Sequence, residues 1–438
     1  TKFIKGADVN VENAWKEMTT GDPSIIVAVL DEGVDVSHPD LKANMWVNEG
    51  EIWKSHEDND GNGYAGDVHG YNFVSKHGVI STDSRYDTGH GTHVAGVIAA
   101  VNNNGLGISS IAGGDGSESG VKIMSCQIFS GQYAGTVLEE VRAIKYAADN
   151  GAVILQCSWG YNSAKSNLIM GYTPGPATEE EWAALYPLEK EALDYFINCA
   201  GSPNGVIDGG LAIFASGNEY AAQSSFPAAY SKCISVAAVA ADYTPASYSN
   251  YGPEVRLCAP GGDLEYYGTP GQSDTSYDES GNLREQGAIF STLVLNGVAG
   301  YGYYEGTSMA CPHVSGVVAL GISYARKLGK KLTREQLTSM LLTSVNDIDQ
   351  YLKSGTKKFY DAMLKTEQMF RSHNITGDST DRQMVQEIAL QLGVSVDSRT
   401  WAVMGKLYTI PLPTGYTFRE VLGYIASMYA GCFVMTDQ

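Results

Sequence analysis

Five short apolar runs, separated by segments with a helical pattern, limit the folds open to this chain more than any other feature. Each run is continuous rather than alternating: 25–30 (IIVAVL), 121–128 (VKIMSCQI), 152–157 (AVILQC), 211–215 (LAIFA) and 233–239 (CISVAAV). Continuous apolar runs of this length are typical of strands that are buried on both faces of a sheet. We therefore expect these segments to be the inner strands of a parallel sheet.

Helical patterns fill two of the intervals between these runs. Residues 136–149 place four apolar side chains on one helical face: Val137, Val141, Ile144 and Ala148. Residues 178–198 predict a single further helix, with Thr178 as its N-cap and acidic residues in its first turn. Strands that alternate with helices indicate βαβ units. The sequence therefore predicts an α/β fold with a doubly wound, mainly parallel sheet and helices on both faces.

The last part of the chain has a different character. A polar segment at 372–382 is typical of a linker. After its start we expect a helix, a strand, a turn, a helix and a strand, at 382–392, 406–411, 413–415, 417–429 and 432–435. We predict two domains: residues 1–365, and a small C-terminal α/β module at 366–438.

Composition and net charge argue against several classes of function. Hydrophobic residues make up 43% of the chain and charged residues 18%, which indicates a globular protein with a core rather than a disordered chain. The net charge of −20 argues against binding to nucleic acid or to an anionic membrane surface. This charge serves solubility, or it creates a field that favours basic substrates.

Neither a transmembrane segment nor a secretory signal is predicted. No apolar run approaches the ~20 residues that cross a bilayer. Residue 1 is threonine rather than an initiator methionine, which indicates a processed or trimmed chain.

The seven cysteines are residues 126, 157, 199, 233, 258, 311 and 432. None forms a Cys-x-x-Cys pair, so a zinc ribbon or a thioredoxin-type motif is not expected. Cys126, Cys157 and Cys233 lie in the apolar runs, and we interpret them as small buried hydrophobic residues. One disulfide could form, and the odd number leaves at least one thiol free.

Two segments in the first quarter of the chain carry residues suited to acid–base chemistry. Asp31 ends the first apolar run, at the sheet edge where α/β folds place their sites, although an acid here also suits a turn. His90 follows a glycine at the expected start of a helix, with His93 one turn later. This His-x-x-His spacing could suit a metal, but the Glu of the HExxH zinc motif is absent.

A third segment carries a candidate nucleophile. Ser308 lies in the string GTSMACPHVSG, at the expected start of a buried helix. A hydroxyl at the positive end of a helix stands where a developing oxyanion is stabilised. An N-cap role for Ser308 is the alternative interpretation. Pro312 is tolerated near the start, because the first N–H groups of a helix have no partner within it.

Asp31, His90 and Ser308 follow one another in the order found in subtilisin. Over residues 8–350 the chain resembles the subtilisin-like serine proteases, the subtilases of peptidase family S8. The resemblance is carried by three long strings, VAVLDEGVDVSHPDL (27–41), HGTHVAG (90–96) and GTSMACPHVSG (306–316), and by SWG (158–160), FASGN (214–218), SNYGP (249–253) and CAPGG (258–262).

The resemblance implies roles for four residues. Ser308 resembles the nucleophile, His90 the general base and later the acid, and Asp31 the carboxylate that orients the histidine. Asn218 resembles the side-chain donor of the oxyanion hole, which acts with the backbone N–H of Ser308. The implied function is a secreted serine endopeptidase that hydrolyses peptide bonds through an acyl-enzyme on Ser308.

The resemblance also implies where substrate binds. Pairing with extended peptide backbone tolerates many sequences, as an endopeptidase requires. The residues implied are Ser158, Trp159 and Gly160 on one strand, Ala215, Ser216 and Gly217 at the primary specificity pocket, and Tyr133 near a distal subsite. Trp159 replaces a leucine that is commoner in the family, and we hypothesise that its indole narrows a subsite. Glu32 replaces the usual Thr or Ser after the catalytic Asp and raises the local negative charge.

Two loops are candidates for structural calcium, which prefers about 6–8 oxygen ligands. In the first loop, the candidate ligands are Asp58, Asp60, Asn62 and Asp67. A hydrogen-bonded Asx turn is the alternative interpretation of this loop. The second loop, 102–107, resembles the calcium loop of the family, with Asn103 as a ligand and Asp40 as the completing carboxylate.

The remaining expectations concern partners and location. No organic cofactor is implied, and the expected partners are a protein or peptide substrate and an inhibitory prodomain that is not in this chain. The resemblance implies a secreted, cell-surface or periplasmic protein. A binding scaffold without turnover, a transpeptidase or peptide ligase, and a non-peptide esterase remain alternatives. The C-terminal module could support the first domain, dock a partner or membrane-tethered element, or occupy the cleft as an inhibitor.

Overall fold

The computed structural model describes residues 6–82, 87–117, 119–130, 133–168, 171–201, 205, 207–264, 287–345 and 348. The chain divides into two compact units, Thr1–Asn346 and Asp347–Gln438. All that follows concerns the first unit. The C-terminal module predicted at 366–438 lies outside the described residues, and so does Cys432.

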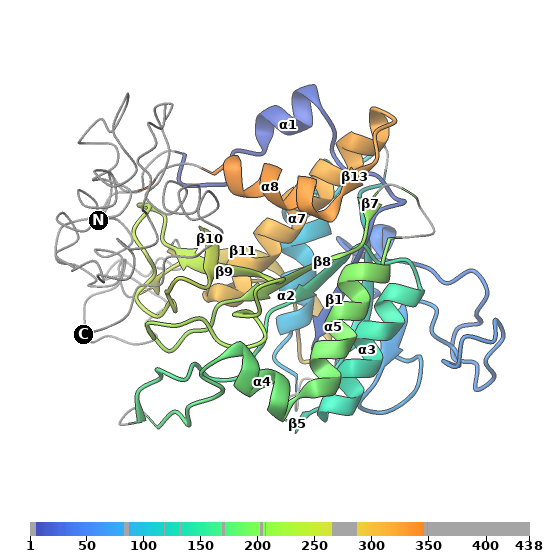
Figure 1. The fold of residues 1–438 in the computed structure, drawn as a ribbon. Helices are drawn as coiled ribbons and strands as arrows, with labels where there is room; N and C mark the ends of the chain where they lie inside the picture. The colour runs from blue at the N-terminus through green and yellow to red at the C-terminus, as the bar shows by residue number, and fades with distance from the viewer. Residues whose placement is uncertain are drawn as a thin grey trace, which may run out of the picture. The chain divides into compact units, whose positions relative to one another are not determined.

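A seven-stranded sheet forms the centre of the first unit (Figure 1). Its strands, in spatial order, are β10 (Val255–Pro260), β9 (Ile234–Val239), β8 (Leu211–Ala215), β6 (Ile154–Cys157), β1 (Ile26–Asp31), β3 (Lys122–Gln127) and β2 (Gly70–Asn72). Every neighbouring pair in this sheet is parallel. The five predicted inner strands are all present, and the predicted α/β fold is confirmed.

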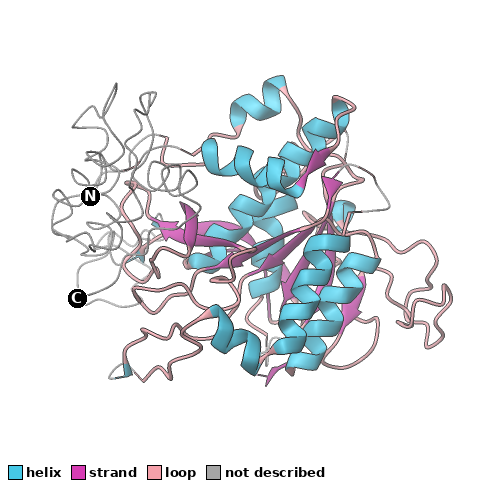
Figure 2. Ribbon diagram, in the orientation of Figure 1, coloured by secondary structure: helices cyan, strands magenta, loops and turns pink. Residues whose placement is uncertain are grey.

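Helices cover both faces of this sheet (Figure 2). On one face, α2 (His90–Ala99) and α7 (Thr307–Lys327) contribute to one core cluster. On the other face, α3 (Val137–Asp149) and α5 (Pro187–Cys199) contribute to a second cluster and lie side by side in Figure 1. Two covered faces explain why the inner strands are apolar throughout rather than alternating.

β1 shows how one strand serves both cores. All six of its residues are buried. Because successive side chains point to opposite faces, Val27 and Val29 join the cluster with α2 and α7, whereas Ala28 and Leu30 join the cluster with α3 and α5. The strand therefore ends at Asp31 with its direction set by packing on both sides.

Shorter elements complete the first unit. The helices are α1 (Glu12–Glu17), the 3-10 helix η1 (Lys42–Asn44), α4 (Glu179–Leu185) and α8 (Arg334–Thr343). The strand pairs are antiparallel β4 (Phe129–Ser130) with β5 (Tyr133–Ala134), parallel β7 (Ile207–Asp208) with β13 (Leu332–Thr333), and the antiparallel hairpin β11 (Ile289–Leu295) with β12 (Val298–Tyr304). None of the helices in the described ranges combines the length and apolar character that a membrane crossing requires.

The single helix predicted at 178–198 is wrong, because the structure has α4 and α5 there. The break lies at Tyr186, whose backbone angles, φ −130° and ψ 57°, are not helical. Proline disfavours helical geometry in the residue before it, and Pro187 begins α5, where its missing N–H has no cost. The predicted N-cap is present, since Thr178 Oγ1 accepts a hydrogen bond from Glu181 N at 3.1 Å.

The described cysteines are free thiols. Cys126 and Cys157 are buried on β3 and β6, and Cys233 is buried directly before β9, as predicted for small hydrophobic residues; Cys311 is buried as well. Cys199 is exposed.

Candidate active site

The carboxyl ends of β1, β6 and β8 lie at one edge of the sheet, where parallel α/β folds place their sites. Asp31 is the last residue of β1. His90 is the first residue of α2, as predicted. His90 Nδ1 and Asp31 Oδ1 lie 2.7 Å apart, which is a short hydrogen bond between a buried carboxylate and a partly exposed imidazole. The structure thus joins two residues that are 59 positions apart in the chain.

Small residues let α2 approach β1 this closely. A side-chain carbon at Gly91 would lie only 2.2 Å from the carbonyl oxygen of Glu32. Gly89, the N-cap of α2, has a left-handed φ of 84°, which favours glycine. These two positions explain the glycines on either side of His90.

Ser308 is the second residue of α7. Its predicted alternative role as N-cap is wrong, because Gly306 occupies that position with a φ of 146°. Ser308 Oγ donates to Ser158 O at 3.2 Å, and Ser158 Oγ donates to Ser308 O at 2.7 Å. The second bond has a clear cause, since Pro312 has no N–H to donate to the carbonyl of Ser308. Ser158 therefore supplies the donor that the proline removes.

Asn218 follows β8 and faces the start of α7. Its Oδ1 accepts hydrogen bonds from Thr307 N at 2.9 Å and Thr307 Oγ1 at 2.8 Å, which orients the amide. A side-chain carbon at Gly306 would lie 3.5 Å from Asn218 Nδ2 and 3.8 Å from Ser308 Cβ. The amide nitrogen and the Ser308 side chain therefore border the same space.

A cavity of about 210 Å³ opens beside Ser308. It is lined by Ser158, Trp159, Gly160, Tyr161, Tyr172, Ala215, Gly217, Asn218, Glu219, Ser225, Thr307 and Ser308. The structure thus brings most of the predicted substrate residues together. Ser216 is not among the lining residues. It is fully buried, and its backbone N–H donates to Val236 O at 3.0 Å.

The other predicted substrate residues have different surroundings. Tyr133 lies on β5, and its side chain is outside the described part of the structure. The Trp159 ring packs edge-on against Phe129 and Phe214, with centroid separations of 6.2 and 5.4 Å. The narrowing of a subsite by this indole stays a prediction.

Comparison with known proteins decides the family. The sequence pattern of the subtilase family matches residues 22–370. This chain belongs to the subtilase family. The subtilase is 31% identical to a halolysin of Haloferax mediterranei, over 67% of this chain and 44% of that protein. It is 30% identical to the major intracellular serine protease of Bacillus subtilis, over 80% of this chain and 82% of that protein.

Solved structures show the same fold. A protease from Pseudoalteromonas arctica matches with a TM-score of 0.53 and 23% identity, over 79% of this chain and 90% of that one. Fervidolysin from Fervidobacterium pennivorans matches with a TM-score of 0.50 and 25% identity, over 78% of this chain and 42% of that one. The subtilase spans less than two thirds of some curated relatives, with 44% of the halolysin and 64% of a thermophilic serine proteinase from a Bacillus species.

Burial and charge adjust the pKa values around the Asp31–His90 pair. Burial opposes the charged imidazole of His90, but the carboxylates of Asp31 and Glu32 together raise its pKa above the usual value. Burial lowers the pKa of His93 to about 4, so this second histidine is neutral near pH 7. His93 Nε2 lies 3.0 Å from the carbonyl oxygen of Ile289. His93 does not belong to the group of possible metal ligands found among the described residues.

Glu219 is the main cavity residue that the sequence-based prediction missed. It lines the cavity directly after Asn218, and its carboxylate accepts a hydrogen bond from Asn250 Nδ2. Burial raises its pKa. Its position next to Asn218 in the sequence was a usable signal. Tyr161, Tyr172, Ser225 and Thr307 also line the cavity, and they carried no signal of their own.

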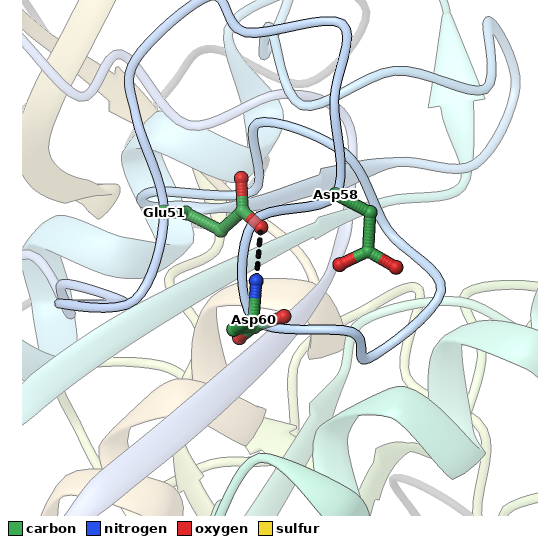
Figure 3. A group of neighbouring side chains, drawn as sticks. All are labelled: Glu51, Asp58 and Asp60. Atoms are coloured by element: carbon green, nitrogen blue, oxygen red, sulfur yellow. Dashed lines mark hydrogen bonds between the residues drawn. The ribbon is translucent and has the colours of Figure 1, made fainter.

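The first candidate calcium loop gathers acidic side chains between η1 and β2. Ligand oxygens of Glu51, Asp58 and Asp60 lie within 4.8 Å of one another, and Figure 3 shows the three side chains gathered on one looped segment. The loop backbone donates to these groups, as in the bonds from Asn59 N to Glu51 Oε1 and from Gly63 N to Asp58 Oδ2. None of the described ion pairs includes these three carboxylates. Oxygen ligands with uncompensated charge fit Ca²⁺.

The other two predicted ligands of this loop, Asn62 and Asp67, are hydrogen-bonded to each other. Asp67 is buried and accepts from Asn62 Nδ2 at 3.0 Å and from Tyr146 OH at 2.6 Å. Glu51, which joins the cluster, was missed by the sequence-based prediction because it precedes the run of alternating oxygen ligands.

The second candidate loop suits calcium less well. Asp40 is fully buried, and its carboxylate accepts from Asn104 Nδ2 at 2.6 Å, Ile108 N at 3.2 Å and Tyr301 OH at 3.3 Å. Asn103 turns away from Asp40 and donates to Asp115 O at 3.1 Å. Among the described residues, the acidic oxygens close enough together to hold a metal ion are those of Glu51, Asp58 and Asp60, and Asp40 is not among them. Calcium binding by Asp40 and Asn103 stays a prediction.

Proposed function

We propose that this subtilase is a serine endopeptidase that hydrolyses peptide bonds through an acyl-enzyme on Ser308. The observation that carries the proposal is the 2.7 Å bond between His90 and Asp31 at the sheet edge where Ser308 and Asn218 border one cavity. Membership of the family and relatives named as serine proteases support the same reaction.

The proposed first step transfers a proton and forms a carbon–oxygen bond. Ser308 Oγ turns from Ser158 O towards His90 Nε2, gives its proton to that nitrogen, and attacks the scissile carbonyl carbon. Asp31 accepts the Nδ1–H bond and stabilises the imidazolium. One oxygen of its carboxylate, Oδ2, is buried and has no hydrogen-bond partner among the described residues, so its charge is only partly compensated.

The remaining steps release the two halves of the substrate. The carbonyl oxygen becomes an oxyanion, which accepts from Asn218 Nδ2 and from the backbone N–H of Ser308. His90 then protonates the leaving amine nitrogen as the C–N bond breaks, which leaves an acyl-enzyme. Water gives a proton to His90 and attacks the ester carbon. The bond between that carbon and Ser308 Oγ then breaks, and the proton on His90 passes to Ser308 Oγ.

We also propose that the peptide lies along Ser158–Gly160, with one side chain in the cavity bordered by Ala215 and Gly217. Its backbone would pair with the first segment, while Tyr133 would contribute to a distal subsite. Calcium would be held by Asp58 and Asp60 together with Glu51, as a structural ion outside the reaction.

The proposed location of this subtilase rests on the names of two relatives. An extracellular basic protease of Dichelobacter nodosus is 27% identical over 79% of this chain, and a halolysin-like protease of Natrialba magadii is also named extracellular. We propose that this subtilase acts outside the cytoplasm, although the Bacillus subtilis relative is named intracellular.

A fluorophosphonate probe tests the reaction directly, because it reacts only with an activated serine. Mass spectrometry should locate the adduct on Ser308, and Ser308→Ala should abolish labelling. Cleavage of a casein substrate should be lost in the same variant. A folded protein that is neither labelled nor active would instead be a subtilase-fold binding scaffold.

Partition of the acyl-enzyme separates hydrolysis from ligation. With an added amine nucleophile, a protease should give mainly the hydrolysed product, whereas a peptide ligase would give mainly the aminolysed one. Asn218→Ala should keep the labelled serine but lower kcat by about 10²–10³-fold, the size of loss known for an oxyanion donor of subtilisin.

A further inference from the structure

Glu32 lies directly beside the Asp31–His90 pair, and the mechanism above assigns it no role. Its side chain is buried. One carboxylate oxygen, Oε2, accepts four hydrogen bonds: from Thr88 N at 2.9 Å, Thr88 Oγ1 at 3.1 Å, Gly89 N at 3.0 Å and His90 N at 3.0 Å. Hydrogen bonds to a charged acceptor are about twice as strong as neutral ones. The strand that ends at Asp31 is thus bonded to the backbone of His90 itself.

The start of α2 depends on this carboxylate. Gly89 is the N-cap and has no side chain that could accept from the first N–H groups of the helix. Such groups need an acceptor when they are buried, and a negative charge is favourable at a helix N-terminus. Glu32 meets both needs from a position 58 residues earlier in the chain.

Thr88 extends the same arrangement to the segment before Ser308. Tyr304, the last residue of β12, donates from its hydroxyl to Thr88 O at 2.6 Å. Its ring also stacks on His93, with centroids 4.8 Å apart. Thr88 is therefore bonded on one side to the segment of Asp31 and on the other to the segment that leads to Ser308.

Three ionisable side chains lie around Glu32 and His90, namely those of Tyr304, His93 and Asp31. Burial raises the pKa of Tyr304 and lowers that of His93 to about 4, so both are uncharged at neutral pH. Asp31 is the other carboxylate in this surrounding.

One further histidine, His313 on α7, lies within electrostatic range of His93. Burial lowers the pKa of His313, so it adds no positive charge at neutral pH. Burial and the charge of Asp31 raise the pKa of Glu32. Above that pKa, its carboxylate adds its negative charge to that of Asp31 beside the imidazole of His90.

We propose that Glu32 is a positioning residue for the catalytic histidine. Its carboxylate fixes the start of α2 so that the imidazole of His90 stays against Asp31, and its charge favours the protonated imidazole that forms during the reaction. This inference rests on the proposed function of His90. Glu32 acts through the histidine and is not itself a catalytic group.

Three variants separate the effect of Glu32 on the position of His90 from the effect of its negative charge. Glu32→Gln keeps the size of the side chain and an acceptor oxygen but removes the charge, whereas Glu32→Ala removes both. Glu12→Gln is the matched control, because Glu12 lies on α1 with its side chain 76% exposed and the substitution removes the same charge. The kcat, the KM and the melting temperature of each variant would be measured from pH 5 to pH 9.

The expected results differ between the variants. Glu32→Ala should lower kcat by about 10–100-fold with little change in KM, because a small displacement of a catalytic group is costly. Glu32→Gln should retain most of the plateau kcat. Its acidic limb in kcat/KM should move to lower pH by about one unit, because a nearby negative charge is lost. Glu12→Gln should change neither quantity.

A readout without turnover distinguishes failure of this inference from failure of the proposed function. NMR titration of the His90 imidazole in Ser308→Ala should give a higher pKa than in Ser308→Ala with Glu32→Gln. Equal pKa values, an unmoved acidic limb, or full kcat in Glu32→Ala would overturn the role of Glu32. A lowered melting temperature with an unmoved titration would make Glu32 merely structural. Absence of labelling and cleavage in the parent protein would overturn the proposed function, while the titration would still decide on Glu32.

Discussion

At the scale of single residues, the charge of Glu219 bears on which substrates are cut. Its carboxylate lines the cavity that begins beside Ser308, and the other lining side chains are uncharged. This carboxylate is partly buried, and a negative charge at the cavity wall favours a cationic side chain over a neutral one of similar size. The side chain that precedes the scissile bond would enter this cavity.

We therefore predict that Glu219→Gln lowers the preference for lysine over glutamine before the scissile bond. The ratio of the two kcat/KM values should fall by about tenfold, because a partly screened charge pair contributes about 1 kcal/mol or slightly more. Two peptides that differ only at this residue supply the measurement. An unchanged ratio would show that the cavity does not receive this side chain.

At the scale of elements, α7 is a helix whose start is completed by another segment. Because Pro312 leaves the carbonyl of Ser308 without an intrahelical donor, Ser158 Oγ supplies the bond at 2.7 Å. The hydroxyl of Ser158 in turn accepts from Gln156 Nε2 at 2.8 Å. β6 and its continuation therefore help to set the position of Ser308.

Ser158→Ala should destabilise the protein by about 1–3 kcal/mol, since the partly buried carbonyl of Ser308 and the buried side-chain amide of Gln156 each lose a partner. It should also lower kcat, because the start of α7 loses its support. Chemical denaturation and peptide hydrolysis would measure the two effects. Ser37→Ala, on an exposed turn, is the control and should change neither.

The contact between α3 and α5 holds two buried carboxyl groups. Burial raises the pKa of Glu189 to about 7, and burial together with the charge of Glu189 raises the pKa of Glu140 to about 8. One oxygen of each side chain has no hydrogen-bond partner among the described residues. Because both folded pKa values exceed the ordinary value, the folded state binds more protons than the unfolded state between these values.

The free energy of unfolding should therefore fall as the pH rises from about 4.5 to about 8, and level off above that. Glu189→Gln should flatten this slope and stabilise the protein at pH 8, by on the order of 3 kcal/mol at most. Gln can still accept the bond that Trp182 Nε1 donates at 2.7 Å. Denaturant titrations at several pH values, in the Ser308→Ala background, would measure the free energy of unfolding. Glu191→Gln, at an exposed position on the same helix, is the control. A slope that Glu189→Gln leaves intact would contradict the assignment.

At the scale of the whole molecule, calcium is predicted to stabilise the first unit through the loop of Glu51, Asp58 and Asp60. A ligand that binds only the folded state adds about 2.7 kcal/mol at a concentration of 100 Kd. Calcium should raise the melting temperature of Ser308→Ala protein, and EDTA should reverse the rise. Asp58→Asn combined with Asp60→Asn should abolish the response, whereas Asp40→Asn should lower stability equally with and without calcium. A calcium response lost only in Asp40→Asn would assign the ion to the other loop.

The sequence by itself determined the parallel sheet, because strands buried on both faces must be apolar throughout, as residues 25–30 and 211–215 are. It also determined that His90 and Ser308 begin helices, since the glycines and small residues around them are local signals. The break at Tyr186 could have been predicted too, because Pro187 disfavours helical geometry in the residue before it.

Only the tertiary structure decided which distant groups meet. Nothing in the sequence near Glu32 indicates that it accepts from Thr88 and His90, because a cap supplied from another segment depends on how that segment packs. The donors that surround Asp40 likewise come from separate loops, including Tyr301 on β12. Local patterns specify strands and helices, but hydrogen bonds between segments exist only once the two cores have brought those segments together.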